Sequence, residues 1–350
     1  MSMWKDEELS SLFLKKIPLI DVRAPIEFQD SSIPNSINLP LLDDEQRARI
    51  GTCYKQHGQE EAIKLGHELI SGDLKEKKIN QWIEYLKKHS EAEIYCFRGG
   101  LRSQITCEWL REKGFHKYPL RGGHKRIRNF FLSWLNDGPI PQLIRIGGPT
   151  GSGKTELLQF FSHHLDLEKL AHHKGSAFGS CGPQPSQISF ENHLALHLLE
   201  SQNKIIILED ESATIGQRVI PKRFFSALRS SPLVILETSK EERMKNIFNG
   251  YVQNNRAEFF VNNLQRIQKK LGKTKVNSLI ENIEWAFSKP MNIIHHEGWI
   301  SVLLSDYYDP LYLKDLRNNK EKIVFQGDEE GVKEFINSQI LSSFTQRTQN

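Results

Sequence analysis

Long hydrophobic runs and paired cysteines are both missing from this chain of 350 residues. No apolar stretch approaches the roughly 18 residues that a membrane-spanning helix requires, so no membrane partner is expected. The four cysteines, Cys53, Cys96, Cys107 and Cys181, lack the paired spacing of metal sites. They are also too few for a disulfide framework, and we expect reduced thiols.

The chain also lacks a strong charge of one sign, internal repeats and low-complexity tracts. Its net charge of +4 permits a polyanionic partner without requiring one, so any argument for nucleic-acid binding depends on local patches. Charged residues at Lys5, Asp6, Glu7 and Glu8 occupy a segment where a secretory signal would be apolar. We therefore expect a cytoplasmic protein.

What the chain does have is the patterning of two α/β domains. Turn-forming residues with two prolines at 136–141 predict a linker, which gives domains at 1–136 and 137–350. In the first domain, short apolar runs alternate with helical periodicity, which predicts a parallel sheet covered by helices. The strands are expected at 18–22, 37–39 and 94–97, and the helices at 60–70, 75–89 and 102–113.

The second domain shows the same alternation and then a helical extension. Strands are expected at 143–146, 205–208 and 233–237, with a helix from 154 to about 164. From 240 to 287 the pattern becomes helical, polar and locally basic.

Residues 148–155 fit the phosphate-binding pattern G-x-x-x-x-G-K-[ST] between an expected strand and an expected helix. Inward-pointing backbone N–H groups, the helix N-terminus and a mobile ammonium would bind phosphate. The alternative is a glycine-rich turn that binds nothing. The candidate residues of this P-loop are Gly148, Gly151, Ser152, Gly153, Lys154 and Thr155, the last of them a possible Mg²⁺ ligand.

Glu209, Asp210 and Glu211 follow the expected strand 205–208 directly. One of these acids is predicted to hold the metal or a water bound to it. The alternative is a solvated acidic strand end, because charges at strand ends are common.

A second anion-binding loop begins at Cys96, at the end of the strand expected at 94–97. Backbone N–H groups, a helix N-terminus and two arginines would favour the thiolate, which makes Cys96 a nucleophile able to carry a terminal sulfur or selenium anion. The alternative is a buried structural cysteine. The other candidates in this Cys96 loop (96–103) are Arg98, Gly99, Gly100, Arg102 and Ser103.

The first domain resembles a rhodanese domain. The resemblance rests on the segments 21–23, 27–28, 33–40, 96–103 and 118–123. The Cys96 loop is about a residue longer than in common sulfurtransferases, and its C-x₅-R spacing also fits cysteine phosphatases, so a phosphatase remains an alternative.

The chain as a whole resembles the tRNA 2-selenouridine synthase family, in which a rhodanese domain precedes a P-loop domain. Further matching segments are 51–56, 65–67, 170–179, 208–212, 215–216 and 307–312. The resemblance implies a transferase that replaces sulfur by selenium in wobble 2-thiouridine of tRNA. It also implies selenophosphate as selenium donor, geranyl diphosphate as second substrate, an S-geranyl-2-thiouridine intermediate and an enzyme that supplies selenophosphate as a possible partner.

Both small substrates contain phosphate, so the assignment of each to one of the two loops stays open, as does any use of ATP or GTP. A P-loop with Mg²⁺ would stabilise a departing diphosphate electrostatically. Cys96 would either carry selenium as a perselenide or bind the donor.

Two further groups of residues are candidates for binding. A small residue beside a leucine would admit a prenyl chain, and the alternative is a plain surface helix; this group is Tyr54, Lys55, Gln56, Leu65, Gly66 and His67. Basic residues of the second domain would contact phosphate or the tRNA backbone, and the alternative is a solvated face; this group is His172, His173, Lys174, Arg266, Lys269, Lys270, Lys273 and Lys275.

Two other functions stay open on the sequence. The P-loop would mark a kinase or NTPase regulated by the cysteine domain, or the chain would be a tRNA-binding adaptor with a vestigial rhodanese module. Neither explains why the two motifs are joined.

Overall fold

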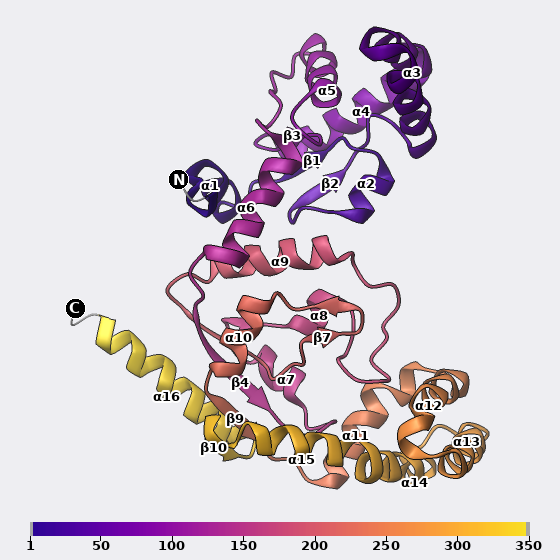
Figure 1. The fold of residues 1–350 in the computed structure, drawn as a ribbon, viewed down its shortest axis with the longest axis vertical. Coiled ribbons are helices and arrows are strands. Elements are labelled where there is room, and N and C mark those ends of the chain that lie inside the picture. The colour runs from indigo at the N-terminus through magenta and orange to yellow at the C-terminus, as the bar shows by residue number, and fades with distance from the viewer. Residues whose placement is uncertain (1–2, 348–350) are drawn as a thin grey trace. The chain divides into compact units, whose positions relative to one another are not determined.

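The computed structural model describes residues 3–347, drawn in Figure 1. The chain forms two compact units, Met1–Pro139 with Pro185–Gln202, and Ile140–Gln184 with Asn203–Asn350. They are called here the first unit and the second unit. The segment 185–202, expected with the second domain, packs with the first unit. In the described part of the chain, no helix is long and apolar enough to cross a membrane.

The first unit contains a parallel three-stranded sheet in the order β2 (Ser36–Asn38), β1 (Leu19–Asp21), β3 (Glu93–Tyr95). The three expected strands are confirmed. Helices surround the sheet, and the parallel arrangement confirms the predicted α/β class. They are α1 (Glu7–Leu14), α2 (Pro25–Asp30), α3 (Asp44–Leu69), α4 (Gly72–Lys88), α5 (Leu101–Glu112), α6 (Gly123–Asp137) and α9 (Gln187–Glu200), with a 3₁₀ turn at Met3–Lys5.

Helix α3 differs most from its prediction, since it begins well before residue 60. Its start is capped by Asp43, whose side chain accepts from the backbone of Gln46. The helix is kinked at Gly58, where φ is 85° and ψ is −175°. Only Ala62 is fully buried along its length, so the helix carries almost no apolar periodicity for the sequence to reveal.

The second unit contains a parallel five-stranded sheet in the order β10 (Ile323–Gly327), β9 (Leu233–Leu236), β4 (Gln142–Gly147), β6 (Ile205–Glu209), β5 (His164–Leu165). The three predicted strands are its central ones, and the two edge strands were not predicted. Helix α7 (Lys154–Gln159) ends sooner than expected because the chain turns at Phe160 to reach β5. The remaining elements around this sheet are α8 (Leu167–Ala171), α10 (Lys222–Ser230), α16 (Glu329–Arg347) and the hairpin β7 (Thr214–Ile215) with β8 (Arg218–Val219).

The helical part of the second unit has a hydrophobic core of its own, which corrects the expectation of a polar region at 240–287. Phe260, Leu264, Val276, Ile283 and Trp299 are buried together there. Polar residues dominate only the outward faces, which hid the core in the sequence. The elements are α11 (Lys240–Gly250), α12 (Ala257–Leu271), α13 (Lys273–Phe287), α14 (Ile293–Leu303), a π-helical turn (Leu304–Tyr308) and α15 (Asp309–Asn318), with 3₁₀ turns at Val252–Asn254 and Lys320–Lys322.

Candidate functional site

Cys96 lies at the end of β3, and its loop leads directly into α5. The Cys96 Sγ lies 3.2 Å from the hydroxyl of Ser103, which is completely buried. Burial of the thiol acts to raise its pKa, but hydrogen bonds from the Ser103 side chain, from the backbone N–H groups of Ser103 and Arg98, and the charge of Arg102 lower the pKa overall. Cys107 shows the opposite case, since burial raises its pKa to about 12.

The start of α6 closes the Cys96 loop from the other side. The backbone N–H of His124 donates to the carbonyl of Cys96 at 2.9 Å, and that of Lys125 donates to Phe97 at 2.9 Å. At Gly123 φ is 52°, and a Cβ there would lie 2.2 Å from the carbonyl oxygen of Cys96. Only glycine fits so close to the loop.

The two arginines of the loop have different surroundings. Arg102 forms a two-pronged ion pair with Glu27, at 2.5 and 3.2 Å, so its guanidinium is already engaged. Arg98 is exposed and lies over the ring of Phe97. The loop itself therefore offers backbone N–H groups and the exposed Arg98 to an incoming anion, whereas the buried Ser103 hydroxyl bonds to Cys96 and Gly100.

A cavity of about 670 Å³ adjoins the Cys96 loop. Of the six residues expected at a prenyl pocket, Tyr54, Lys55, Gly66 and His67 line it, whereas Gln56 and Leu65 do not. Its remaining lining, which is mainly apolar, is Leu41, Leu42, Arg47, Ile50, Gly51, Gln59, Ala62, Ile63, Ile70, Phe97, Arg98, Leu101, Arg102, Ile105 and Trp109. We call this space the first-unit cavity.

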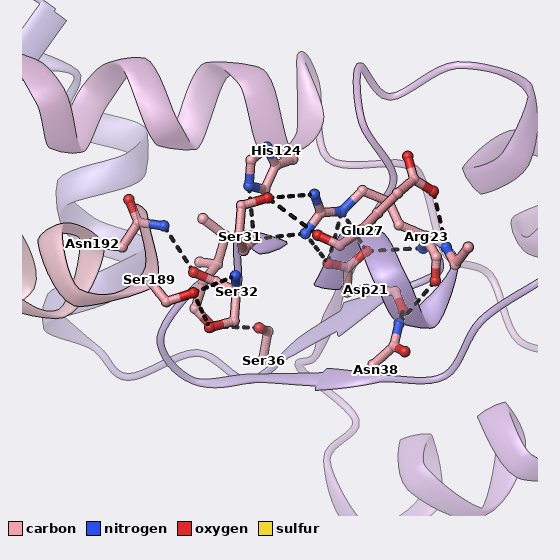
Figure 2. A network of polar contacts seen from close by, with 12 residues as sticks. Asp21, Arg23, Glu27, Ser31, Ser32, Ser36, Asn38, His124, Ser189 and Asn192 are labelled. Carbon is pink, nitrogen blue, oxygen red and sulfur yellow. Dashed lines mark hydrogen bonds and ion pairs between the residues drawn. The ribbon is translucent and has the colours of Figure 1, made fainter. Parts of the chain in front are cut away.

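A buried polar network links the segment 21–32 to His124 and to α9, as Figure 2 shows. The Asp21–Arg23 ion pair is 2.7 Å long and buried, and Arg23 donates to the carbonyl of Ser31. The ring of His124 also bonds to that carbonyl, at 2.9 Å. Burial lowers the pKa of His124 to about 4, so this ring is neutral at pH 7. Polar contacts with α9 complete the network: Ser189 with Ser32, and Asn192 with the carbonyl of Ser32.

The P-loop of the second unit joins β4 to α7, which is the strand–loop–helix context expected for it. Gly151 and Gly153 have φ of 82° and 87°, values that other residues rarely adopt. The Lys154 Nζ donates to the carbonyl of Gly148 at 2.9 Å, and the Thr155 hydroxyl donates to Glu209 at 2.9 Å. Ser152 is buried within the same loop.

The three consecutive acids after β6 take three different positions. Glu209 contacts Thr155, as a metal-holding partner of the P-loop would. Asp210 is bound by Arg145 at 2.7 Å and by Arg229 at 2.9 Å. Its carboxylate is therefore committed to the fully buried Arg145.

Glu211 joins a cluster that the sequence did not reveal. Ligand atoms of Glu168, Glu209 and Glu211 all lie within 4.8 Å of one another. Burial and the neighbouring carboxylates raise the pKa of Glu168 to about 9 and that of Glu211 to about 8. Strand pairing explains why Glu168 joins the cluster. Glu168 follows β5, which runs parallel to β6, so the ends of both strands lie at the same edge of the sheet. Converging carboxylates of this kind suit a hard divalent cation.

A pocket of about 600 Å³ combines the P-loop, these acids and the helical part of the unit. Among the predicted basic contacts, Lys174 and Lys270 line this P-loop pocket. His172 bonds to the carbonyl of Pro183, and burial lowers the pKa of His173; neither lines the pocket. The other basic candidates lie exposed near the junction of α12 and α13, with Lys275 paired to Asp306; they are Arg266, Lys269, Lys273 and Lys275.

Fold and site together define a two-domain protein in which a rhodanese-like domain precedes a P-loop domain. The rhodanese-like domain model matches residues 6–129, and the model of the tRNA 2-selenouridine synthase AAA domain matches residues 141–343. The tRNA 2-selenouridine synthase of Shewanella denitrificans is 41% identical over 345 residues, 92% of this chain and 94% of that one. That of Nitrosomonas europaea is 40% identical over 373 residues, 94% of this chain and 97% of that one. This chain belongs to the tRNA 2-selenouridine synthase family.

Proposed function

We propose that this protein is a transferase that replaces the sulfur of wobble 2-thiouridine in tRNA by selenium, using selenophosphate, through an S-geranyl intermediate made from geranyl diphosphate. The proposal places the enzyme in the cytoplasm, with tRNA and a selenophosphate-supplying enzyme as partners. The observation that supports it most is the first-unit cavity. A thiolate loop alone would serve simple sulfur transfer, whereas a large apolar cavity beside it has a use if a prenyl chain must be held there.

The reaction needs both the cavity and the Cys96 loop. Sulfur doubly bonded to C2 is a poor leaving group and must first be prenylated before selenium can replace it. In the first step the sulfur attacks C1 of the geranyl group. The C1–O bond breaks, diphosphate leaves with the electron pair, and N3 of the base loses its proton. In the second step the selenium of selenophosphate adds at C2, the C2–S bond breaks, and the departing geranylthiolate takes up a proton. Water then takes the phosphoryl group, so that the P–Se bond breaks and phosphate is released. Backbone N–H groups around Cys96 would stabilise the soft anion before it attacks.

A divalent cation fits the second unit. Thr155 and Glu209 would hold it at the P-loop, with Glu168 and Glu211 close enough to assist. Bound there, Mg²⁺ would supply positive charge to a phosphate ligand.

The phosphatase alternative loses its main support from the position of Arg102. In a C-x₅-R phosphatase loop this arginine binds the substrate phosphate, but here Glu27 engages both of its terminal nitrogens. The lowered pKa of Cys96 argues against a vestigial module, because a structural cysteine has no need of these hydrogen bonds.

The proposed function is tested by separating its two steps with Cys96→Ala. Prenyl transfer requires no protein nucleophile, whereas selenium delivery requires the anion site at Cys96. The variant, incubated with 2-thiouridine tRNA, geranyl diphosphate and selenophosphate, should accumulate S-geranyl-2-thiouridine in nucleoside mass spectrometry. Cys107→Ala serves as the matched control and should make 2-selenouridine. Normal 2-selenouridine formation by Cys96→Ala, or loss of both products in a folded variant, would refute this division of labour.

A further inference from the structure

The two pockets differ sharply in the charge of their linings. Four cationic side chains line the first-unit cavity, and no acidic one is among its lining residues in the described chain; the four are Arg47, Lys55, Arg98 and Arg102. The P-loop pocket has twice as many acids as lysines. Its acids are Glu156, Glu168, Glu209, Asp210, Glu211 and Asp315, and its lysines are Lys154, Lys174 and Lys270.

Two cations of the first-unit cavity are available for a ligand. Arg47 and Arg102 both contact Glu27, which offsets part of their charge. Among the side chains of residues 3–339, neither Lys55 nor Arg98 has an ion-pair partner, and both are exposed. Lys55 comes from α3 and Arg98 from the Cys96 loop, yet both line the same apolar space.

The P-loop pocket presents the opposite situation to a phosphate ligand. Asp210 is neutralised by its arginines, but Glu168, Glu209 and Glu211 remain close together beside Lys154. When these three carboxylates are ionised together they repel a diphosphate, so an anion would bind beside them in company with a divalent cation.

We propose that geranyl diphosphate is held entirely within the first unit, with its chain in the first-unit cavity and its diphosphate on Lys55 and Arg98, without a metal ion. This inference rests on the proposed function and decides which anion occupies which loop. Arginine binds phosphate oxygens in a bidentate manner and lysine acts as a point charge, so the pair can offset part of the charge of the diphosphate that leaves. The P-loop pocket is then free for a different, metal-dependent phosphate ligand.

Binding of geranyl diphosphate to the full-length protein, measured by calorimetry in EDTA and in Mg²⁺, tests the proposal. Affinity should be the same in both buffers. The double variant Lys55→Ala/Arg98→Ala should bind about tenfold or more weakly, because two charged contacts are lost. Gly66→Leu should also weaken binding, since its side chain fills the cavity. Lys154→Ala should bind as wild type does, and Lys77→Ala, an exposed lysine outside the cavity, is the charge control.

The possible outcomes separate this inference from the proposed function. A requirement for Mg²⁺, a clear loss of affinity in Lys154→Ala, or unchanged affinity in the double variant would each overturn the inference, even while tRNA prenylation continues. If the wild-type protein neither binds geranyl diphosphate nor prenylates 2-thiouridine tRNA, the proposed function itself fails. Both substituted side chains of the double variant are exposed, so its fold should be retained.

Discussion

Cys96 illustrates how a single side chain acquires its chemistry from a few neighbours. Burial acts against the thiolate, and the first interaction that opposes it is the hydrogen bond from Ser103. The arginines, which look decisive in the sequence, contribute less directly: Arg102 is paired with Glu27 and Arg98 lies over Phe97. Hydrogen bonds to the charged form lower a pKa most effectively where water is excluded.

Ser103→Ala should therefore raise the pKa of Cys96. The rate of alkylation follows the thiolate fraction, so the midpoint of its pH profile should move to higher pH in the variant. The profile is measured by iodoacetamide labelling and peptide mass spectrometry, and its midpoint is independent of how accessible the thiol is. Wild-type Cys96 should titrate below Cys107, whose pKa is raised to about 12. Equal midpoints in wild type and Ser103→Ala would rule out this role for the hydroxyl, and Ser133→Ala is the control.

At the scale of one element, the kink in α3 shapes the first-unit cavity. Residues before the kink, such as Tyr54, and after it, such as Gly66, line the same space. A straight helix would carry the later residues in another direction. Gly58 makes the bend possible because its backbone angles are accessible essentially to glycine alone.

Gly58→Ala should strain or straighten the helix at a cost of about 1–3 kcal/mol. We expect a lower melting temperature together with weaker binding of geranyl diphosphate, measured by scanning calorimetry and titration. Gly51→Ala is the matched control for stability, since a Cβ at residue 51 meets nothing within 4 Å and helical alanine is favoured over glycine. An unchanged melting temperature for Gly58→Ala would show that the kink is not required.

At the scale of the whole molecule, α9 packs as part of the first unit. In the sequence, however, it lies within residues 141–343, which match the family model of the second domain. Its apolar face includes the buried Phe190 and Leu194, and α6 is its main neighbour. Arg128 of α6 also binds Asn192 at 2.8 Å. The chain thus leaves the second unit after α8 and returns to it at β6.

Amide hydrogen exchange should show α9 opening together with the first unit. Phe130→Ala removes a fully buried ring of α6, a change that typically costs about 3–5 kcal/mol. Exchange in α9 should accelerate in this variant, while β6 and β9 stay protected. Phe224→Ala, in the core of the second unit, is the reciprocal control and should leave α9 unchanged. Faster exchange of α9 in Phe224→Ala, but not in Phe130→Ala, would contradict the assignment of α9 to the first unit.

Central strands and the two anion-binding loops could be predicted from the sequence, whereas edge strands and amphipathic helices often could not. β4, β6 and β9 are buried on both faces and read as apolar runs, but β10 alternates half-buried and exposed residues. Of the predicted site residues, Lys174 and Lys270 reach the P-loop pocket, and Lys269 lies outside it. Glu168 was missed because only strand pairing brings it beside Glu209.

The sequence by itself determined local chemistry: a P-loop whose glycines permit φ above zero, a cysteine followed by N–H donors, and an order of motifs specific to one family. Each of those features is formed by residues that are close together in the chain, so it can be recognised in the sequence. Only the tertiary structure decided which of three adjacent acids meets Thr155, which arginine stays available beside Cys96, and that a cationic apolar cavity lies next to that loop. The reason is that burial, ion pairing and pocket lining are set by residues far apart in the chain, which only packing brings together.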